Sequence, residues 1–275
     1  MPPTMPNRAN YLYCLCFLLL GLSACGNYEK VLKSNDINYK LTKANEYFDK
    51  KDFVHASELY QGLLPVVKGT KNFEPMYYKY AYSYYNMKDY LSASYHFKNF
   101  VDFFPSSKEA EECEFMHAVS LYKMSPKYSL EQTNTIKAME AMQSYINTHP
   151  GSKRIVEANT YIDEARQKLE MKDAGAAKLY YNINQFKAAA VAFKSVNHSY
   201  PESASSDYYQ YMVIKSYYYF AKASVPEKQE ERFTSCLSAY QEFKQTYPAS
   251  KYNSDAEKYQ SLATNYLKKL RNEHQ

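Results

Sequence analysis

The stretch YAYSYYNMKDYLSASYHFKNFVDFFPSS, residues 80–107, decides the fold. Within it, the small residue Ala93 is followed four residues later by Phe97 and three residues further on by Phe100, and Pro105 ends the run. Intervals of four and three place these side chains on one face of an α-helix, and a proline stops such a helix. The stretch therefore predicts a helix that presents one small and two large side chains to its neighbours.

A second predicted helix precedes this one. Ala81 stands twelve residues before Ala93, and the polar run Asn86–Asp89 between them has the composition of a short turn. Two helices can cross closely where both carry a small side chain, and large aromatic residues then fill the space beside the crossing. The unit is thus a pair of antiparallel helices.

The same pattern recurs along the chain. Four strings mark the ends of repeats: Phe104-Pro105, His149-Pro150, Tyr200-Pro201 and Tyr247-Pro248, each with a serine two residues after the proline. Twelve residues before these prolines stand Ala93, Ala138, Ala189 and Cys236, and an earlier copy without its proline has Ala56. The first helices carry Ala44, Ala81, Ala118 and Ala177. The serines are expected to cap the following helices.

Two pairs contain extra residues between their helices. In the third pair, Ser125–Gln132 is predicted to be an insertion in the turn. In the fifth pair, with Lys215 as the first-helix position, the stretch around Ala223–Glu231 is predicted to be another.

This pattern resembles the tetratricopeptide repeat. The resemblance covers about five repeats from residue 37 to 251 and implies an all-α solenoid whose first helices line a concave wall. The apolar stripe of Tyr252–Leu270 predicts a C-terminal capping helix. We expect one tetratricopeptide-repeat domain over residues 37–272.

The N-terminus has the pattern of a secretion signal. Arg8 precedes the ten-residue apolar run Tyr11–Leu20, which is too short to span a bilayer. The string Leu22-Ser23-Ala24-Cys25 resembles the lipobox of bacterial lipoproteins. That resemblance implies that Cys25 receives a diacylglycerol on its sulfur and that residues 1–24 are then removed. The alternative is an ordinary signal peptide with a stray cysteine.

Residues 25–36 are expected to be a linker to the lipid anchor. Once Arg8 is removed with the signal, 33 Lys and Arg residues face 29 Asp and Glu residues, which does not favour nucleic acid as a partner. Cys113 and Cys236 are expected to be small packing residues rather than a disulfide.

The repeats show no recognisable catalytic motif, so we expect no enzyme activity and no cofactor other than the lipid on Cys25. Cys113 and His117 have metal-ligand spacing, but a structural zinc needs four ligands and no second pair supports them. The acidic residues Glu109, Glu111, Glu112 and Glu114 are interpreted as a solvated helix start.

The mature chain also resembles the BamD family, the lipoprotein subunits of the outer-membrane β-barrel assembly machine. The resemblance is carried by Ala44–Tyr60, by Tyr80–Pro105 and by the insertion Ser125–Ala138. It implies a periplasm-facing protein that is anchored to the outer membrane. Its partners would be a BamA-type β-barrel protein, which repeats four and five would bind, other subunits of the complex, and unfolded outer-membrane proteins.

Three alternatives remain open at this point. The chain could be a periplasmic tetratricopeptide lipoprotein that coordinates envelope constriction or cell-wall synthesis. It could be a glycan-binding lipoprotein of the SusD kind, although those chains are much longer, or it could be an enzyme.

In the tetratricopeptide family, the inner wall is formed by first-helix residues that flank the small packing position. Carried over to this sequence, the resemblance implies a peptide-binding groove of Asn45, Asp49, Tyr78, Tyr82, Tyr85, Asn86, Phe115, Val119, Tyr122 and Lys123. Such a wall could hold an extended, aromatic-rich segment. Any one of these tyrosines could instead belong to the core.

Overall fold

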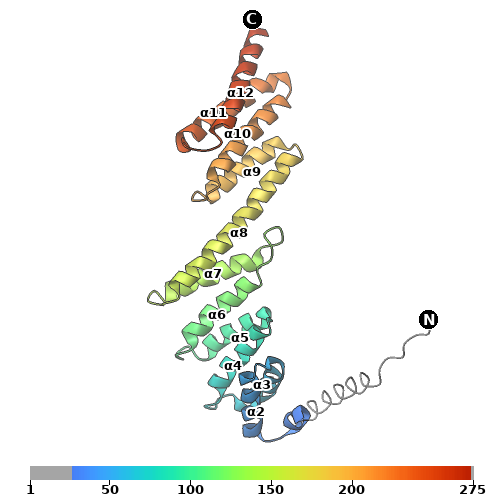
Figure 1. Ribbon diagram of the computed structural model, residues 1–275, viewed down its shortest axis with the longest axis vertical. Coiled ribbons are helices and arrows are strands. Elements are labelled where there is room, and N and C mark those ends of the chain that lie inside the picture. The colour runs from blue at the N-terminus through green and yellow to red at the C-terminus, as the bar shows by residue number, and fades with distance from the viewer. Residues whose placement is uncertain (1–26, 274–275) are drawn as a thin grey trace, which may run out of the picture. The chain divides into compact units, whose positions relative to one another are not determined.

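The computed structural model describes residues 27–273, which form helices and connecting turns without a β-strand (Figure 1). A short helix covers residues 27–33. The later helices are α2 (Ile37–Asp49), α3 (Phe53–Val67), α4 (Phe73–Asn86), α5 (Tyr90–Phe103), α6 (Ala110–Lys123), α7 (Thr133–Thr148), α8 (Ile155–Asn182), α9 (Phe186–Ser199), α10 (Ser206–Lys222), α11 (Pro226–Thr246) and α12 (Asn253–Glu273). Among the described residues, no helix is both long enough and apolar enough to cross a bilayer.

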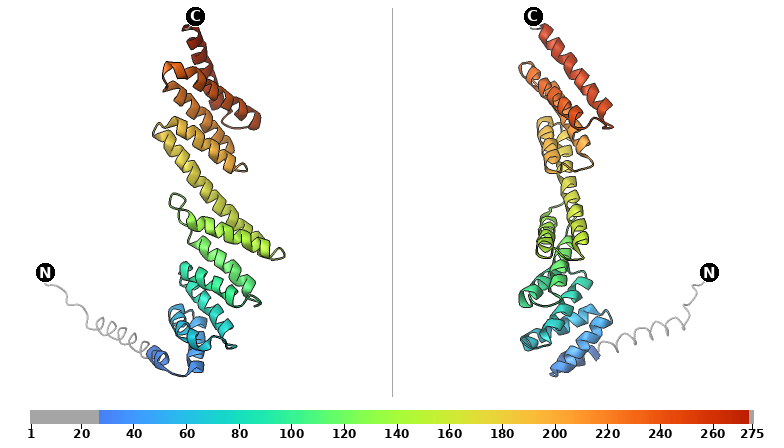
Figure 2. Two further views of the ribbon diagram at one scale, coloured as in Figure 1. Left: turned by 180° about the vertical axis from the view of Figure 1, so that it is seen from behind. Right: turned by 90° about the vertical axis from the view of Figure 1, so that its left-hand side faces the viewer.

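The described chain divides into two compact units. Unit 1 contains residues 27–125 and 133–162, and unit 2 contains residues 126–132 and 163–273. In both units consecutive helices are antiparallel neighbours joined by short connections, as the views from two further sides also show (Figure 2). The predicted all-α fold of tetratricopeptide-type helix pairs is confirmed.

Unit 1 is built from the pairs α2–α3, α4–α5 and α6–α7 and from the beginning of α8. The small residues predicted at the helix crossings are buried, with 0–1% of their surface exposed: Ala44, Ala56, Ala81, Ala93, Ala118 and Ala138. The large residues predicted beside Ala93, namely Phe97 and Phe100, are also fully buried, as are Met142 and Tyr145 at the same spacing after Ala138. Burial of a Phe or Met side chain contributes about 1.5–3 kcal/mol, so these positions hold the pairs together.

The turns within the pairs share one backbone geometry. Lys51, Lys88 and Asn184 each adopt a positive φ of 62–64°, a conformation that L-residues rarely enter. After the first two turns, Asp52 and Asp89 cap α3 and α5 by accepting a hydrogen bond from the backbone N–H three residues on. These contacts confirm the short polar turn predicted at Asn86–Asp89.

A serine-to-carboxylate hydrogen bond recurs after each proline turn. The serine hydroxyl donates to an acidic side chain of the preceding first helix: Ser107 to Glu74 (2.6 Å), Ser152 to Glu111 (2.5 Å), Ser203 to Glu170 (2.5 Å) and Ser250 to Asp207 (2.7 Å). Glu74, Glu111 and Asp207 lie at the start of their helices, whereas Glu170 lies in the middle of α8. Each Oγ also accepts from the backbone N–H two residues on. The serines therefore close the turn before the next helix begins instead of occupying its N-cap, and they tie successive pairs together.

The bond at Glu111 predicts a pH-dependent contribution to stability. Ser152 and Tyr145 both donate to this carboxylate and hold the pKa of Glu111 below its ordinary value of 4.5. A lowered folded-state pKa stabilises the protein above the unfolded-state pKa, and this stabilisation is lost as pH falls through the folded-state pKa. We expect Glu111→Gln to lower Tm at pH 7 and the gap from the unmodified protein to close towards pH 3.

Thermal unfolding between pH 3 and 7 measures this gap. Glu140→Gln, on the exposed face of α7, is the matched control and should leave Tm nearly unchanged at every pH. An equal gap for Glu111→Gln at pH 3 and at pH 7 would show that the carboxylate charge contributes nothing.

The predicted linker over residues 25–36 is in part a packed helix. In the helix over residues 27–33, Tyr28 and Val31 are buried against the unit 1 core, and the Tyr28 hydroxyl donates to Glu58 Oε2 at 2.6 Å. A tyrosine and a valine at an interval of three form a small apolar face that packs on the first repeat. Folded structure therefore begins no more than two residues after Cys25.

Unit 2 contains the remainder of α8, then α9, α10, α11 and α12. Helix α12 covers the predicted capping stretch and buries Ala256, Ala263 and Leu267. In the fifth pair, Ile214 and not Lys215 occupies the buried position beside Cys236. Ile214 is fully buried and its carbonyl oxygen lies 3.5 Å from the Cys236 thiol, whereas Lys215 is half-buried.

The extra residues of the fifth pair form helix, not a longer turn. Only residues 223–225 connect α10 to α11, and Pro226 begins α11 at a position where its missing N–H costs no hydrogen bond. By contrast, the insertion of the third pair is non-helical and forms the connection between α6 and α7 over residues 124–132. Its Leu130 carbonyl accepts a hydrogen bond from Lys172 on α8 at 2.8 Å.

Helix α8 is longer than the sequence pattern predicted. The alanine pattern indicated a first helix around Ala177, but α8 runs for 28 residues from Ile155 to Asn182. Its first part belongs to unit 1, where Tyr161 packs on Tyr122 with ring centroids 4.8 Å apart, and its last part belongs to unit 2.

The two later cysteines are packing residues, as predicted. Cys113 and Cys236 are buried and are not joined in a disulfide. Burial raises the pKa of both thiols, that of Cys236 to about 12, so both are neutral at pH 7.

Candidate peptide-binding surface

The tyrosines of α4 form the centre of the predicted groove. Tyr78, Tyr82 and Tyr85 are half-buried, and the ring centroids of Tyr78 and Tyr82 lie 4.8 Å apart, with those of Tyr82 and Tyr85 6.4 Å apart. The Tyr82 ring also contacts Phe97 of α5 edge-on at 4.9 Å. We call Tyr78, Tyr82 and Tyr85 the α4 tyrosine cluster, which is supported by the core and in part open to solvent.

A polar chain connects this cluster to the neighbouring first helices. The Tyr82 hydroxyl donates to Glu112 Oε1 on α6 at 2.5 Å, and Arg154, just before α8, binds Glu112 Oε2 at 2.5 Å. Burial and the bond to Glu112 raise the pKa of Tyr82, so its phenol remains a neutral donor. The Arg154 guanidinium also lies 4.5 Å from the Phe115 ring centroid, a cation–π arrangement.

Asn45 and Asp49 of α2 are engaged within the protein. Asn45 Oδ1 accepts a hydrogen bond from Tyr60 at 2.9 Å, which leaves its amide NH₂ group as the donor for a ligand. Asp49 is exposed and pairs with Lys79 of α4 at 3.3 Å. A surface ion pair is worth at most about 1 kcal/mol, so a charged ligand could displace Asp49 from Lys79.

Asn86 and Lys123 are exposed, and Tyr122 is half-buried against Tyr161. The Asn86 side-chain amide donates to the Tyr82 carbonyl of its own helix at 2.8 Å. Asn86 and Lys123 are therefore accessible at the surface.

Phe115 and Val119 lie in the core and not on a groove wall. Their exposed fractions are 1% and 3%, and Phe115 packs on Tyr145 of α7 with ring centroids 5.3 Å apart. Helix α6 is covered by both α5 and α7, so a residue on the predicted inner face can still be enclosed. These two residues are therefore removed from the proposed surface.

Two functional candidates were not identified from the sequence, Glu112 and Arg154. The acidic run of α6 was interpreted as solvated, but its members bind partners: Glu109 with Ser107, Glu111 with Ser152, Glu112 with Tyr82 and Arg154, and Glu114 with Thr148. The sequence shows these acidic residues but does not show which side chains they bind, because the partners lie on other helices or on the turns between helices.

Cys25, the predicted lipid site, lies outside the described residues. Within residues 27–273, no group of three or more His, Cys, Asp or Glu side chains is placed to hold a metal ion, and Cys113 with His117 has no further ligand.

The model of the YfiO family, described as outer membrane lipoprotein, matches residues 34–207, which is more than half of the chain. The chain belongs to this family. The YfiO match begins just before α2 and ends at the start of α10, so it includes the α4 tyrosine cluster, Glu112 and Arg154. Membership agrees with the lipoprotein signal interpreted at Cys25 and with an outer-membrane location.

Other comparisons add little to the YfiO match. No curated protein sequence matches the chain. Among solved structures, the TPR2AB-domain:pHSP90-complex of yeast Sti1 is similar, with 13% sequence identity, coverage of 83% of this chain and 98% of that chain, and a TM-score of 0.39.

Proposed function

We propose that this protein is a lipid-anchored, periplasm-facing scaffold of the outer-membrane β-barrel assembly machine. In this role it binds a BamA-type β-barrel protein and segments of unfolded outer-membrane proteins, and it promotes their folding and insertion without catalysing a covalent step. The YfiO match over residues 34–207 carries the proposal, because it joins an outer membrane lipoprotein family to a fold of helix pairs. Arrays of helix pairs serve as binding surfaces for extended partners.

The α4 tyrosine cluster supports the binding of unfolded segments. Strands of a membrane barrel alternate apolar and polar residues and carry aromatic residues at both membrane interfaces. Tyrosine offers such a segment an apolar ring together with a hydroxyl, and it is enriched at binding surfaces. Asn86 and the Glu112–Arg154 pair add polar groups beside the rings.

Co-purification from detergent-solubilised envelope tests the proposed partner. Recovery of a BamA-type barrel protein in near-equal amount is the expected result. Recovery of cell-wall synthases in its place would favour the alternative role in envelope constriction or cell-wall synthesis.

The surface assignment predicts a loss of peptide affinity. Tyr82→Ala combined with Asn86→Ala should weaken binding of a peptide from the last strand of an outer-membrane barrel by about tenfold or more, the size typical of a hot-spot tyrosine. Fluorescence anisotropy with the labelled peptide measures the affinity. Because Tyr82 is half-buried, circular dichroism must show that the variant keeps its helix content.

Tyr95→Ala is the matched control, since Tyr95 lies on the second helix of the same pair and is 62% exposed. It should change the affinity by less than about twofold. Unchanged affinity in the Tyr82→Ala/Asn86→Ala variant would exclude the α4 tyrosine cluster as the binding surface.

A further inference from the structure

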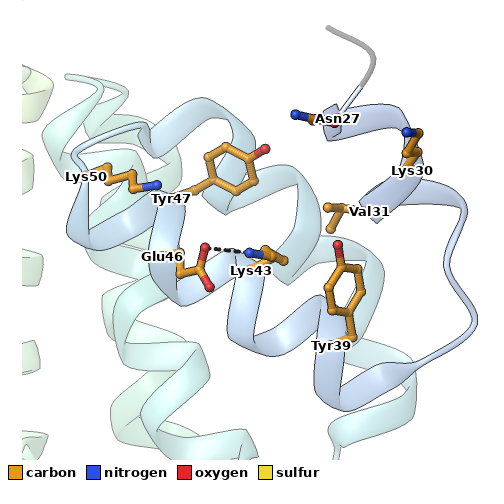
Figure 3. A pocket seen from close by; sticks show the side chains of 8 residues that line it. All are labelled: Asn27, Lys30, Val31, Tyr39, Lys43, Glu46, Tyr47 and Lys50. Atoms are coloured by element: carbon orange, nitrogen blue, oxygen red, sulfur yellow. Dashed lines mark hydrogen bonds and ion pairs between the residues drawn. The ribbon is translucent and has the colours of Figure 1, made fainter. Parts of the chain in front are cut away.

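A basic pocket lies between the helix over residues 27–33 and α2. It has a volume of about 370 Å³ (Figure 3). Its lining consists of Asn27, Lys30, Val31, Tyr39, Lys43, Glu46, Tyr47 and Lys50. We call these residues the N-terminal pocket. Neither the YfiO family description nor the proposed groove includes it.

The charges of the N-terminal pocket favour an anion. Three lysines face one carboxylate, and that carboxylate, Glu46, is paired with Lys43 at 2.8 Å. Within residues 27–273, the ammonium groups of Lys30 and Lys50 have no ion-pair partner. Lys30 lies on the short helix and Lys50 at the end of α2, on opposite sides of the pocket, so both add unpaired positive charge to its lining (Figure 3).

The position of the pocket in the chain identifies the source of that anion. Asn27 lines the pocket and stands two residues after Cys25. Two residues span at most about 7 Å when fully extended. A lipid on Cys25 would therefore hold the pocket at the level of the phospholipid headgroups.

Exposed apolar side chains on the segment over residues 32–39 agree with a position in the headgroup region. Leu32, Ile37 and Tyr39 are 39%, 43% and 40% exposed, and Tyr39 lines the pocket itself. Exposed apolar residues beside lysines are typical of surfaces that lie in the headgroup region, where tyrosine is enriched.

We infer that the N-terminal pocket binds the phosphate of an anionic phospholipid headgroup, with Lys30 and Lys50 supplying the positive charge that attracts it and Tyr39 at the headgroup boundary. This inference rests on the proposed lipid attachment at Cys25. The contact would fix unit 1 against the membrane at a second point, so that the anchor and the pocket together orient the first repeat.

Vesicle binding tests the pocket without the anchor. The probe is a set of vesicles of phosphatidylcholine with or without 30% phosphatidylglycerol, and the protein is the chain of residues 25–275 with Cys25→Ser, which retains every described residue. We expect binding to the anionic vesicles and at least tenfold weaker binding to the neutral ones. Lys30→Gln with Lys50→Gln should weaken the anionic binding by about 30-fold, at about 1 kcal/mol for each lysine and 1.4 kcal/mol for each factor of ten.

Lys71→Gln with Lys153→Gln is the matched control, because these two exposed lysines lie in turns of the same unit. It should change the affinity by less than threefold. An equal loss in the control pair would attribute binding to net charge and overturn the pocket. Saturable binding of inorganic phosphate without binding to anionic vesicles would overturn the lipid source. Mass spectrometry of the native protein tests lipid attachment at Cys25 separately, so failure of the anchor and failure of the pocket are distinguishable.

Discussion

Cys25→Ser is expected to abolish lipid attachment and to remove the protein from the outer-membrane fraction. A hydroxyl cannot form the thioether that carries the diacylglycerol, and the resemblance to the lipobox implies that cleavage before residue 25 follows lipid attachment. Each buried CH₂ of an acyl chain contributes about 0.8 kcal/mol to membrane binding, and two chains anchor a protein stably. No helix among residues 27–273 could replace the anchor by spanning the bilayer.

Membrane fractionation measures the location of the protein, and intact-mass measurement detects the attached lipid. The unmodified protein should be recovered with the outer membrane as a lipid-bearing chain that begins at Cys25, whereas the variant should carry no lipid and should remain uncleaved. Cys16→Ala, within the predicted signal, is the matched cysteine control and should behave as the unmodified protein does. A Cys25→Ser chain with the mass of a lipidated mature protein would show that the anchor lies elsewhere.

Phe97→Ala should strongly destabilise unit 1. Phe97 is fully buried, and its ring lies 4.9 Å from that of Tyr82 and 6.3 Å from that of Tyr85. Removing a buried phenyl ring costs its transfer free energy together with that of the cavity left behind, about 3–5 kcal/mol in all. Since total stabilities are about 5–15 kcal/mol, such a loss is a large fraction of the whole.

Urea unfolding of residues 25–275 with Cys25→Ser as the common background measures this difference. Tyr95→Ala removes an aromatic ring two residues earlier on the same helix, but from a position that is 62% exposed, and should cost less than about 0.5 kcal/mol. Similar midpoints for Phe97→Ala and Tyr95→Ala would mean that the small-large pattern does not define the core.

The sequence predicted the helix pairs well because their signals are local. A small residue that recurs twelve positions apart on two helices, with aromatic residues at helical spacing, specifies where the helices cross. The buried alanines from Ala44 to Ala138 confirm this reading in unit 1. In the fifth pair the predicted position was wrong by one residue, Lys215 instead of Ile214, because the large residue Ile214 stands where the other first helices carry an alanine.

The candidate surface was predicted less well because it depends on neighbouring helices. Tyr78, Tyr82 and Tyr85 remain partly open, but Phe115 and Val119, at comparable positions on α6, are enclosed. Helical periodicity assigns a residue to a face, whereas the helices on either side decide whether that face meets solvent. Glu112 was missed for the same reason, since its partners Tyr82 and Arg154 lie 30 and 42 residues away along the chain.

By itself, the sequence determined the secretion-signal pattern around Cys25, the helix pairs, the short polar turns and the capping helix, because each depends on residues that are close to one another in the chain. The tertiary structure alone decided that residues 27–33 pack as a helix on the first repeat, that α8 continues without a break from Ile155 to Asn182, and that the serines after the prolines bind carboxylates of the preceding first helices. These features arise from contacts between segments far apart in the chain, and their free energy depends on burial and hydrogen-bond geometry that no local pattern encodes.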